Sequence, residues 1–383
     1  MALILNEEQK LLKTSTKEFL ESKSPLSAFR TLRDNGFATY EKDLWTEMVE
    51  MGWTALIIPE KYNGLNFGYV GLGQVLEEMG RKLTVSPILS TVLMSSTLIS
   101  LSKNELLKTK LLQEIMNGSK LISVAHEEGN YHNPEILKTT LKKDNDDFIL
   151  SGEKKFVIDG SVSNYFIVSA IDDSNKNISI CLVDAKAIGI KHNHKVHMDS
   201  RTYSEISFNN VKVNKDNFLS KSDDGKLIMD KTLDITRIGL AAEMLGSIQE
   251  AFDITMSYLK EREQFGVKIG SFQALQHRSA LMFGEIELCK SIVLKSLQLI
   301  DQNKDISKNA SLAKAKLGST FKLVSNEAIQ MHGGIGVTDD ADIGFFLKRA
   351  RVIEKILVVR ESIEKASLTQ RNIDYQFCQA LCA

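Results

Sequence analysis

The sequence predicts an α+β protein in three parts: a helical N-terminal domain, a small central β-domain and a C-terminal antiparallel bundle of four helices. Two observations lead to this prediction. All four prolines of the 383-residue chain lie at or before Pro134, so long uninterrupted helices are permitted in the last two thirds. The hydrophobic pattern also changes from helical to β-rich and back along the chain. We expect domains at residues 1–118, 119–222 and 223–383.

The predicted bundle is the most strongly patterned part of the chain. Its segments carry apolar residues at three- and four-residue intervals and have Asp or Ser at their starts, as amphipathic helices do. Four consecutive helices of this kind favour an antiparallel bundle. The four segments are residues 223–263, 271–301, 307–330 and 342–367.

The other two parts differ in pattern. Between residues 121 and 213, short β-rich runs alternate with turns of Asp, Asn, Gly and Ser, which indicates a small β-domain. These runs include residues 148–150, 165–168, 178–183 and 206–208. The first part, like the last, has a helical pattern. Its candidate helices are residues 7–23, 42–51, 69–81 and 104–116.

Composition narrows the functional classes. With 48 Lys+Arg against 49 Asp+Glu, the net charge of −1 gives no electrostatic basis for binding nucleic acid or a membrane surface. No apolar run approaches the roughly 18 residues of a spanning helix. The acidic N-terminus does not resemble a secretory signal, so a cytoplasmic location is expected. A small molecule or another protein chain is the expected partner.

No metal site is predicted. The four cysteines form no C-x2-C pair, which favours free thiols. His192, His194 and His197 are close in sequence, but their spacing fits no common zinc pattern, so a polar strand or loop is the better interpretation.

Two segments at the ends of predicted bundle helices have the composition of an anion-binding site. Residues 262–266 read REQFG, and residues 330–338 read QMHGGIGVT. Glycines at a helix end let backbone N–H groups approach a phosphate, and an arginine adds a bidentate partner. Each segment alone has a simpler interpretation, because glycine commonly ends a helix and a terminal arginine is often only solvated.

Taken with further segments in the same order along the chain, these motifs resemble the acyl-CoA dehydrogenase family. Residues 51–65, with MGW and PEKYNGL, resemble the family's GW…PEEYGGLG signature. Residues 208–213, FNNVKV, are similar to its F.nV.VP strand but lack the proline. Residues 332–351 resemble a bacterial branch with an HGGIGVTDE-like motif, whose members often form two-component complexes.

This resemblance implies a function and a set of ligands. Family members remove two hydrogens from an acyl-CoA thioester to give a trans-2-enoyl-CoA, and their FAD is shared between subunits. The resemblance implies a homo- or hetero-oligomer, usually a dimer of dimers, with electron-transfer flavoprotein as the electron acceptor. The FAD contacts carried over are Arg262, Gln264, Phe265, Gln330, Gly333, Gly334 and, beside the flavin ring, Phe156.

The chain departs from the family at the catalytic base. The reaction needs a desolvated base at the α-carbon of a polarised thioester. Relatives carry a glutamate at one of two places, which correspond to Leu357 and Thr236 in this chain.

Other glutamates lie near those places. Glu354 and Glu361 fall on the same helical face as Leu357 if the helix is regular, and Glu354 is the first candidate for the base. Glu243 is a weaker candidate, and Arg237 is expected to support the catalytic group.

The segments that resemble the flavin-facing part of the family are also altered. Residues 125–132, AHEEGNYH, stand where relatives carry a TEPxxGSD loop, and residues 156–160, FVIDG, stand for WITNG. Phe156 keeps the apolar flank of the tryptophan, but Ile158 lacks the hydroxyl that would donate to the flavin. A weaker grip on the flavin ring is expected.

These features leave three hypotheses. The leading one is an FAD-dependent dehydrogenase of acyl-CoA thioesters with a displaced base. The second is a non-catalytic or FAD-sharing subunit of a heteromeric acyl-CoA dehydrogenase, because both usual glutamates are missing. The third is a flavin monooxygenase or an enzyme like nitroalkane oxidase on the same fold, which needs no α-proton base of the usual kind.

Overall fold

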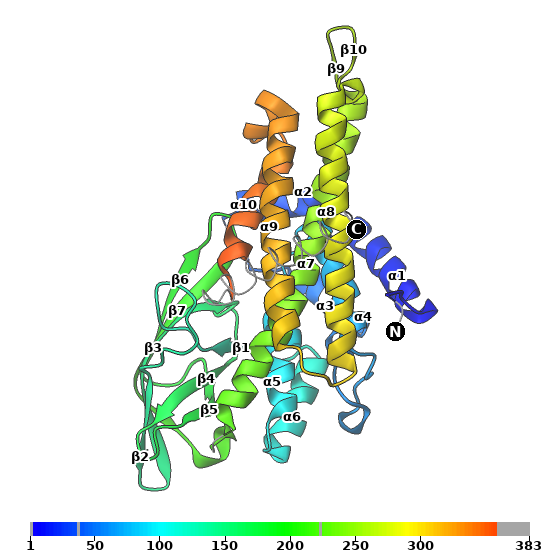
Figure 1. Ribbon diagram of the computed structural model, residues 1–383. Helices are drawn as coiled ribbons and strands as arrows, with labels where there is room; N and C mark the ends of the chain where they lie inside the picture. Colours follow the sequence, from blue (N-terminus) through cyan, green and yellow to red (C-terminus); the bar gives the residue numbers. More distant parts are fainter. Residues whose placement is uncertain (1–2, 37–38, 222–223, 358–383) are drawn as a thin grey trace, which may run out of the picture.

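The N-terminal part is a set of helices packed on the long helices that follow (Figure 1). The computed structural model describes residues 3–36, 39–221 and 224–357. Asn6 and Gln9 begin the first helix with a reciprocal capping box, in which each side chain accepts the other's backbone N–H. The α-helices of this part are α1 (Glu7–Lys23), α2 (Leu26–Asp34), α3 (Lys42–Glu50), α4 (Tyr69–Lys82), α5 (Ser96–Leu101) and α6 (Glu105–Met116).

The sequence did not predict α2, α5 or the π-helix η3 (Ile88–Ser95). Every residue of η3 is buried, so this segment has no polar face from which a helical period could be recognised. Its hydroxyl groups are used internally: the Oγ atoms of Thr91 and Ser95 donate to the carbonyl of Ile122, which starts the first strand. The segment therefore ties the helical part to the β-domain.

The central part is a mainly antiparallel sheet with the strand order β6-β7-β3-β2-β4-β5-β8, and β1 pairs with β4 in parallel. A hydrophobic core separate from that of the helices includes Leu150, Phe166 and Phe208. His192 and His194 lie on the edge strand β6. The strands are β1 (Ile122–Ala125), β2 (Thr140–Asp144), β3 (Asp147–Ile158), β4 (Tyr165–Asp172), β5 (Ile178–Asp184), β6 (Ile190–Val196), β7 (Thr202–Val213) and β8 (Phe218–Ser220).

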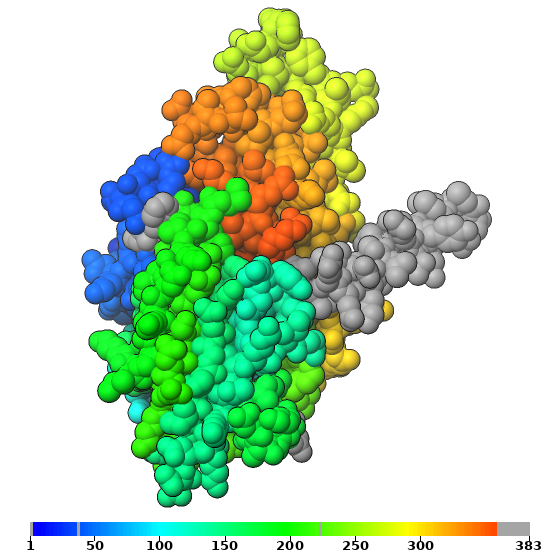
Figure 2. Space-filling model, turned by 90° about the vertical axis from the view of Figure 1, so that its left-hand side faces the viewer, coloured from blue at the N-terminus to red at the C-terminus, as the bar shows by residue number. Residues whose placement is uncertain are grey.

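The C-terminal part is the helical bundle. Figure 1 shows its long helices side by side, with a small hairpin projecting beyond one end. The elements are α7 (Gly225–Glu261), the hairpin strands β9 (Glu263–Gln264) and β10 (Val267–Lys268), α8 (Gln273–Asp301), α9 (Ser307–His332) and α10 (Ile343–Lys355). Figure 2 shows α10 and the end of α9, in orange, lying above the β-domain, in green and teal.

The expectation that the last helix continues through Leu357 is wrong. The helix ends at Lys355, Ile356 is extended, and Leu357 has a left-handed φ of 57°. A buried lysine stabilises this end, because the Nζ of Lys314 donates to the carbonyls of Ile353 (2.8 Å) and Glu354 (3.2 Å). Neither glycine nor proline occurs at residues 354–357, so the sequence gives no signal that the helix ends there.

Contacts between distant segments fix the helices to one another. A Cβ at Gly246 of α7 would overlap the carbonyl oxygen of Glu77 in α4, so the two helices approach closely only because of the glycine. At the start of α4, the carboxylate of Asp301 from the end of α8 accepts the backbone N–H groups of Tyr69 (2.6 Å) and Val70 (3.0 Å). Among the described residues, no helix has the length and apolar content needed to cross a bilayer.

Candidate active site

The two motifs that resemble FAD-binding segments lie at the same end of the bundle. The first follows α7, and the second follows α9. The ring of Tyr258 on α7 stacks on that of His332 at the end of α9, with centroids 4.4 Å apart, and its hydroxyl donates to the His332 carbonyl at 3.3 Å. This contact joins segments that are 74 residues apart in sequence.

Both motifs have solvent-exposed residues with no neighbouring atoms in the way of a ligand. Arg262, Gln264 and Gln330 are exposed. A Cβ placed on Gly333 or Gly334 would meet no atom within 4 Å, and Gly333 has a φ of +65°. Backbone N–H groups there can be approached without obstruction, and a guanidinium lies at the same end of the bundle, so these residues fit the pyrophosphate end of FAD.

The surroundings of these motifs are unusually apolar for an exposed surface. Phe265, in the β9–β10 hairpin, has 92% of its surface exposed, and Val337 has 77%. Further exposed apolar side chains follow on α8 and around the glycines: Leu281, Phe283, Leu288 and Ile335. Clustered exposed apolar residues mark protein interaction sites more often than isolated ones do.

At the other end of the predicted site, neither position of the missing glutamate offers a base. Thr236 is buried, and its hydroxyl donates to the carbonyl of Thr232 in the same helix. Leu357 is also buried, and its carbonyl accepts a hydrogen bond of 2.9 Å from the Nε of Arg237. Arg237 therefore lies next to both positions.

Because α10 stops at Lys355, Glu354 does not share a helical face with Leu357. Its Cγ lies over Gly318 of α9, 3.8 Å from a Cβ placed there, and its carboxylate is 3.3 Å from the Nζ of Lys355. The regular helix that supported Glu354 as a displaced base is absent. Glu361 lies outside the described residues.

Glu243 belongs to a buried ionic network between the C-terminal bundle and the β-domain. Its carboxylate is 2.7 Å from Arg349 of α10 and 3.2 Å from Arg201 of the β-domain. Arg349 also pairs with Asp199 at 2.8 Å. Burial acts to raise the pKa of Glu243, but the charges of Arg349 and Arg201 outweigh it and hold the pKa below its usual range. A carboxylate held in this way is poorly placed to accept a substrate proton.

Asp159, which stands where the WITNG motif has its asparagine, lies close to this network. Its carboxylate accepts a hydrogen bond of 2.5 Å from the hydroxyl of Ser90 in η3. Burial raises the pKa of Asp159 to about 6, although Ser90 and Arg201 act in the opposite direction. Nearby, the ring of Phe156 stacks on Tyr203 with centroids 5.4 Å apart.

The altered loop after β1 brings a group that the sequence did not single out. His132 lies with its Nδ1 2.5 Å from the Oε1 of Glu127, and the side chain is only 5% exposed. The NH2 of Arg237 donates to the Nε2 of His132 at 3.2 Å, and its NH1 pairs with Asp234 at 2.6 Å. His132 is 105 residues away from Arg237 in sequence, and no local pattern signals that they meet.

A buried ion pair holds this loop in place. The Nζ of Lys154 lies 2.6 Å from the carboxylate of Glu128 and donates to the carbonyl of His126 at 3.0 Å. Glu128 also accepts the backbone N–H groups of Lys138 and Thr139, which closes the loop onto itself. Burial lowers the pKa of Lys154 to about 8 and that of His126 to about 4.

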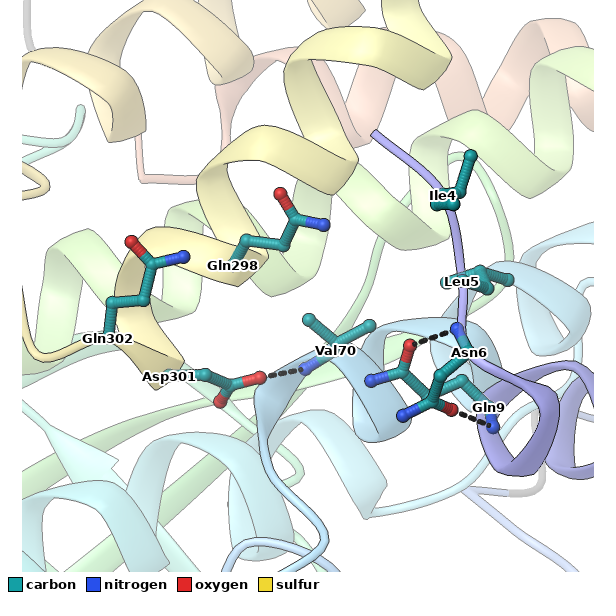
Figure 3. Close-up of a pocket in the computed structure, with 8 residues that line it drawn as sticks. All are labelled: Ile4, Leu5, Asn6, Gln9, Val70, Gln298, Asp301 and Gln302. Carbon is teal, nitrogen blue, oxygen red and sulfur yellow. Dashed lines mark hydrogen bonds between the residues drawn. The ribbon is translucent and has the colours of Figure 1, made fainter. Parts of the chain in front are cut away.

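A separate pocket of about 480 Å³ lies between the N-terminus and α8 (Figure 3). Ile4, Leu5 and Val70 supply apolar surface, while Gln298 on α8 and Gln302 just after it supply polar side chains. The pocket includes Asp301, the last residue of α8, whereas the Arg262 motif comes before Gln273, the first residue of that helix. The pocket is therefore at the far end of that helix from the FAD-like motifs. No cluster of three or more His, Cys, Asp or Glu that could hold a metal occurs among the described residues.

Comparison with known proteins decides the family. Models of the N-terminal, middle and C-terminal domains of acyl-CoA dehydrogenase match residues 6–119, 124–211 and 223–356. The chain belongs to the acyl-CoA dehydrogenase family. It is therefore an oxidoreductase and a flavoprotein, and FAD is its cofactor, as in the family.

Similar proteins cover nearly the whole chain. It is 29% identical over 361 residues to 3-(aryl)acrylate reductase of Clostridium sporogenes, which covers 92% of this chain and 95% of the relative. It is 28% identical over 362 residues to the caffeyl-CoA reductase-Etf complex subunit CarC of Acetobacterium woodii, covering 91% and 94%. Butyryl-CoA dehydrogenase of Megasphaera elsdenii has the same fold, with a TM-score of 0.89 at 24% identity over 97% of this chain and 100% of that one.

The comparisons confirm the predicted family and the α+β fold with helical ends around a central sheet. They do not identify the catalytic base, and the FAD contacts named from the sequence remain predictions.

Proposed function

We propose that the protein is an FAD-dependent oxidoreductase that interconverts a saturated acyl-CoA thioester and its trans-2-enoyl form, with FAD held at a subunit interface. The observation that carries this proposal is the meeting of the Arg262 and Gly333–Gly334 segments at one exposed end of the bundle, joined by Tyr258 and His332.

Each segment has a role in holding the cofactor. Arg262 supplies a bidentate cation for the pyrophosphate, and the backbone at Gly333 and Gly334 supplies unobstructed donors. Gln264 and Gln330 are exposed at the same end and can bond the remaining polar groups. The exposed Phe265 fits either the cofactor or the partner subunit. When bound, FAD accepts the β-hydrogen of the substrate with its two electrons, or returns it in the reverse direction.

The proposal covers both directions because two relatives are reductases by name, one of 3-arylacrylates and one of caffeyl-CoA. The second is named as a subunit of a complex with Etf, which supports electron-transfer flavoprotein as the redox partner of this chain. The exposed apolar side chains around Phe265, Val337 and α8 support an oligomer, homomeric or heteromeric, of which a dimer of dimers is the expected form.

The test is the visible spectrum of the purified chain under anaerobic conditions, before and after addition of an acyl-CoA panel. Bound flavin that bleaches with a saturated acyl-CoA, and reoxidises with the matching enoyl-CoA, is the expected result. Flavin that stays oxidised with every thioester, followed by oxygen consumption when a reductant is supplied, would instead favour a monooxygenase.

A second function has a specific observation in its favour. Leu357 replaces the usual base, and its carbonyl is engaged by Arg237, while Glu243 is held by Arg349 and Arg201. This arrangement fits a subunit that donates the Arg262 end of the FAD site to a catalytic partner. A chain that binds no flavin alone, but gains flavin and activity when mixed with a second family member, would establish it.

A further inference from the structure

The group that occupies the neighbourhood of the missing glutamate is an imidazole. Arg237 contacts the Leu357 backbone through Nε and His132 through NH2, and it directly follows Thr236. One guanidinium thus touches the first family position for the base, adjoins the second, and bonds to His132. Asp234, the other ionisable side chain that bonds to Arg237 within the described part of the chain, is bound in an ion pair.

The contacts of His132 define which nitrogen is basic. An arginine N–H always donates, so the Nε2 atom that it reaches must carry the lone pair. The proton of the neutral ring is then on Nδ1, which faces the carboxylate of Glu127 at 2.5 Å. A carboxylate beside one nitrogen and an unprotonated second nitrogen is the arrangement of a histidine base and its orienting group.

Two carboxylates and one cation surround the ring. Glu127 and Asp234 provide two carboxylates, while Arg237 provides one cation, so the cluster has one net negative charge when His132 is neutral. Lys154 and Glu128 neutralise each other behind the loop, and His126, whose pKa is lowered to about 4 by burial and by Lys154, stays neutral.

We propose that His132 is the base that removes the α-proton of the acyl-CoA thioester in this chain, an inference that rests on the proposed function. The α-C–H bond breaks, an Nε2–H bond forms, and the electron pair moves into the thioester as its enolate. Before this step, the NH2 of Arg237 moves its hydrogen bond from Nε2 to the thioester oxygen, which frees the Nε2 lone pair and then stabilises the enolate. Glu127 is a positioning residue that holds the tautomer.

The first test measures exchange of α-hydrogens, which precedes any transfer of electrons. FAD-loaded protein in D2O is mixed with butyryl-CoA or 3-phenylpropionyl-CoA, and deuterium at the α-carbon is followed by NMR. His132→Gln is expected to lose exchange by roughly 10²–10⁴-fold, the contribution of a general base. His194→Gln, on the edge strand β6, is the matched histidine control and should exchange as the wild type does. FAD binding by each variant shows that it is folded.

A second measurement separates a chemical role of His132 from a structural one. His132→Ala removes the ring, and added imidazole should restore part of the exchange, whereas a structural defect would not respond to it. Glu127→Gln should keep acyl-CoA affinity, lower the exchange rate, and move its pH profile. ¹⁵N spectra of histidine-labelled protein, assigned with His132→Gln, should show an unprotonated Nε2 at neutral pH.

The outcomes distinguish the inference from the function. If His132→Gln binds FAD and exchanges at the wild-type rate, His132 is not the base, although the proposed function stands. A ring protonated on Nε2 at neutral pH also overturns the inference. If flavin-loaded wild type neither exchanges nor bleaches with the panel, the proposed function fails for the lone chain and the inference fails with it.

Discussion

The two ends of the predicted site differ in how they are built. At the pyrophosphate end, Arg262 and the glycines Gly333 and Gly334 are exposed, and the motif of the family is kept. At the reacting end, Glu243 and Arg349 are buried, Asp159 is half-buried, and the family's groups are replaced. On the proposed function, the recognisable end therefore binds the ligand and contributes little stability. On the same proposal, the altered end supplies the chemistry, and its buried ion pairs also join the β-domain to the bundle.

The largest effect is expected from Arg349→Ala at the buried end. Arg349 is 3% exposed, and its removal leaves Glu243 and Asp199 as buried carboxylates without this partner. Breaking one side of a buried pair costs about 3–5 kcal/mol of unfolding free energy. Denaturant unfolding of the wild type and of Arg349→Ala measures this difference in unfolding free energy. Arg351→Ala, two residues later, loses only an exposed contact with Asn326 and should change stability by about 0.5 kcal/mol or less.

A second substitution at the buried end, Asp159→Asn, should have the opposite effect and raise the free energy of unfolding at neutral pH. The pKa of Asp159 is raised from 3.8 to about 6, so the native state holds its proton more tightly than the unfolded state does. Stability therefore falls as pH rises from about 4 to about 6, by roughly 3 kcal/mol. The variant keeps an acceptor for Ser90 and should lack this fall in urea unfolding between pH 4.5 and 7.5. An unchanged pH profile would contradict the prediction, and Asp173→Asn, in an exposed turn, is the control.

At the exposed end, Arg262→Ala should weaken FAD binding without weakening the fold. A charge-assisted hydrogen bond to phosphate contributes about 1.5–3 kcal/mol, so the dissociation constant of FAD should rise roughly 10- to 100-fold. Fluorescence titration measures the change, and Arg262→Lys should be intermediate. Lys260→Ala, an exposed cation two residues earlier on α7, is the matched control. A large fall in the melting temperature of flavin-free Arg262→Ala would break the proposed contrast between the two ends.

The smallest effect on stability is expected from Phe265→Ser. The side chain is 92% exposed, so the unfolding free energy of the lone chain should change by less than about 0.5 kcal/mol. Subunit association should nevertheless weaken, because an aromatic residue at an interface often contributes strongly to it. Sedimentation velocity compares the oligomers. An unchanged association constant would remove Phe265 from the interface and leave it as a cofactor contact alone.

The fold was predicted well from the sequence where helices have one face exposed to solvent. The start of α9 and the end of α8 follow the predicted segments because polar and apolar residues alternate with a helical period there. The prediction failed for η3, where every residue is buried and no period exists. It also missed the end of α10, which is fixed by Lys314 and Arg237 from other helices.

The site could be predicted only in part for a similar reason. The Arg262 and Gly333 motifs are local, so residue type and spacing suffice to propose them. The relation between His132, Glu127 and Arg237 depends on a loop of the β-domain reaching α7, which no spacing in the sequence encodes. Likewise, Glu243 is a candidate base from its position after Arg237 in the sequence, and only the structure shows the two arginines that pair with it.

The cap that Asp301 places on α4 has a consequence for the order in which the protein forms. The helix that begins at Tyr69 obtains the acceptor for its first N–H groups from a residue 232 positions later. On the ribosome, α4 therefore emerges long before its cap is synthesised, and its first turn has no such partner in the nascent chain. Native closure of this helix depends on a contact of high sequence separation, so we expect it to be among the late steps of folding.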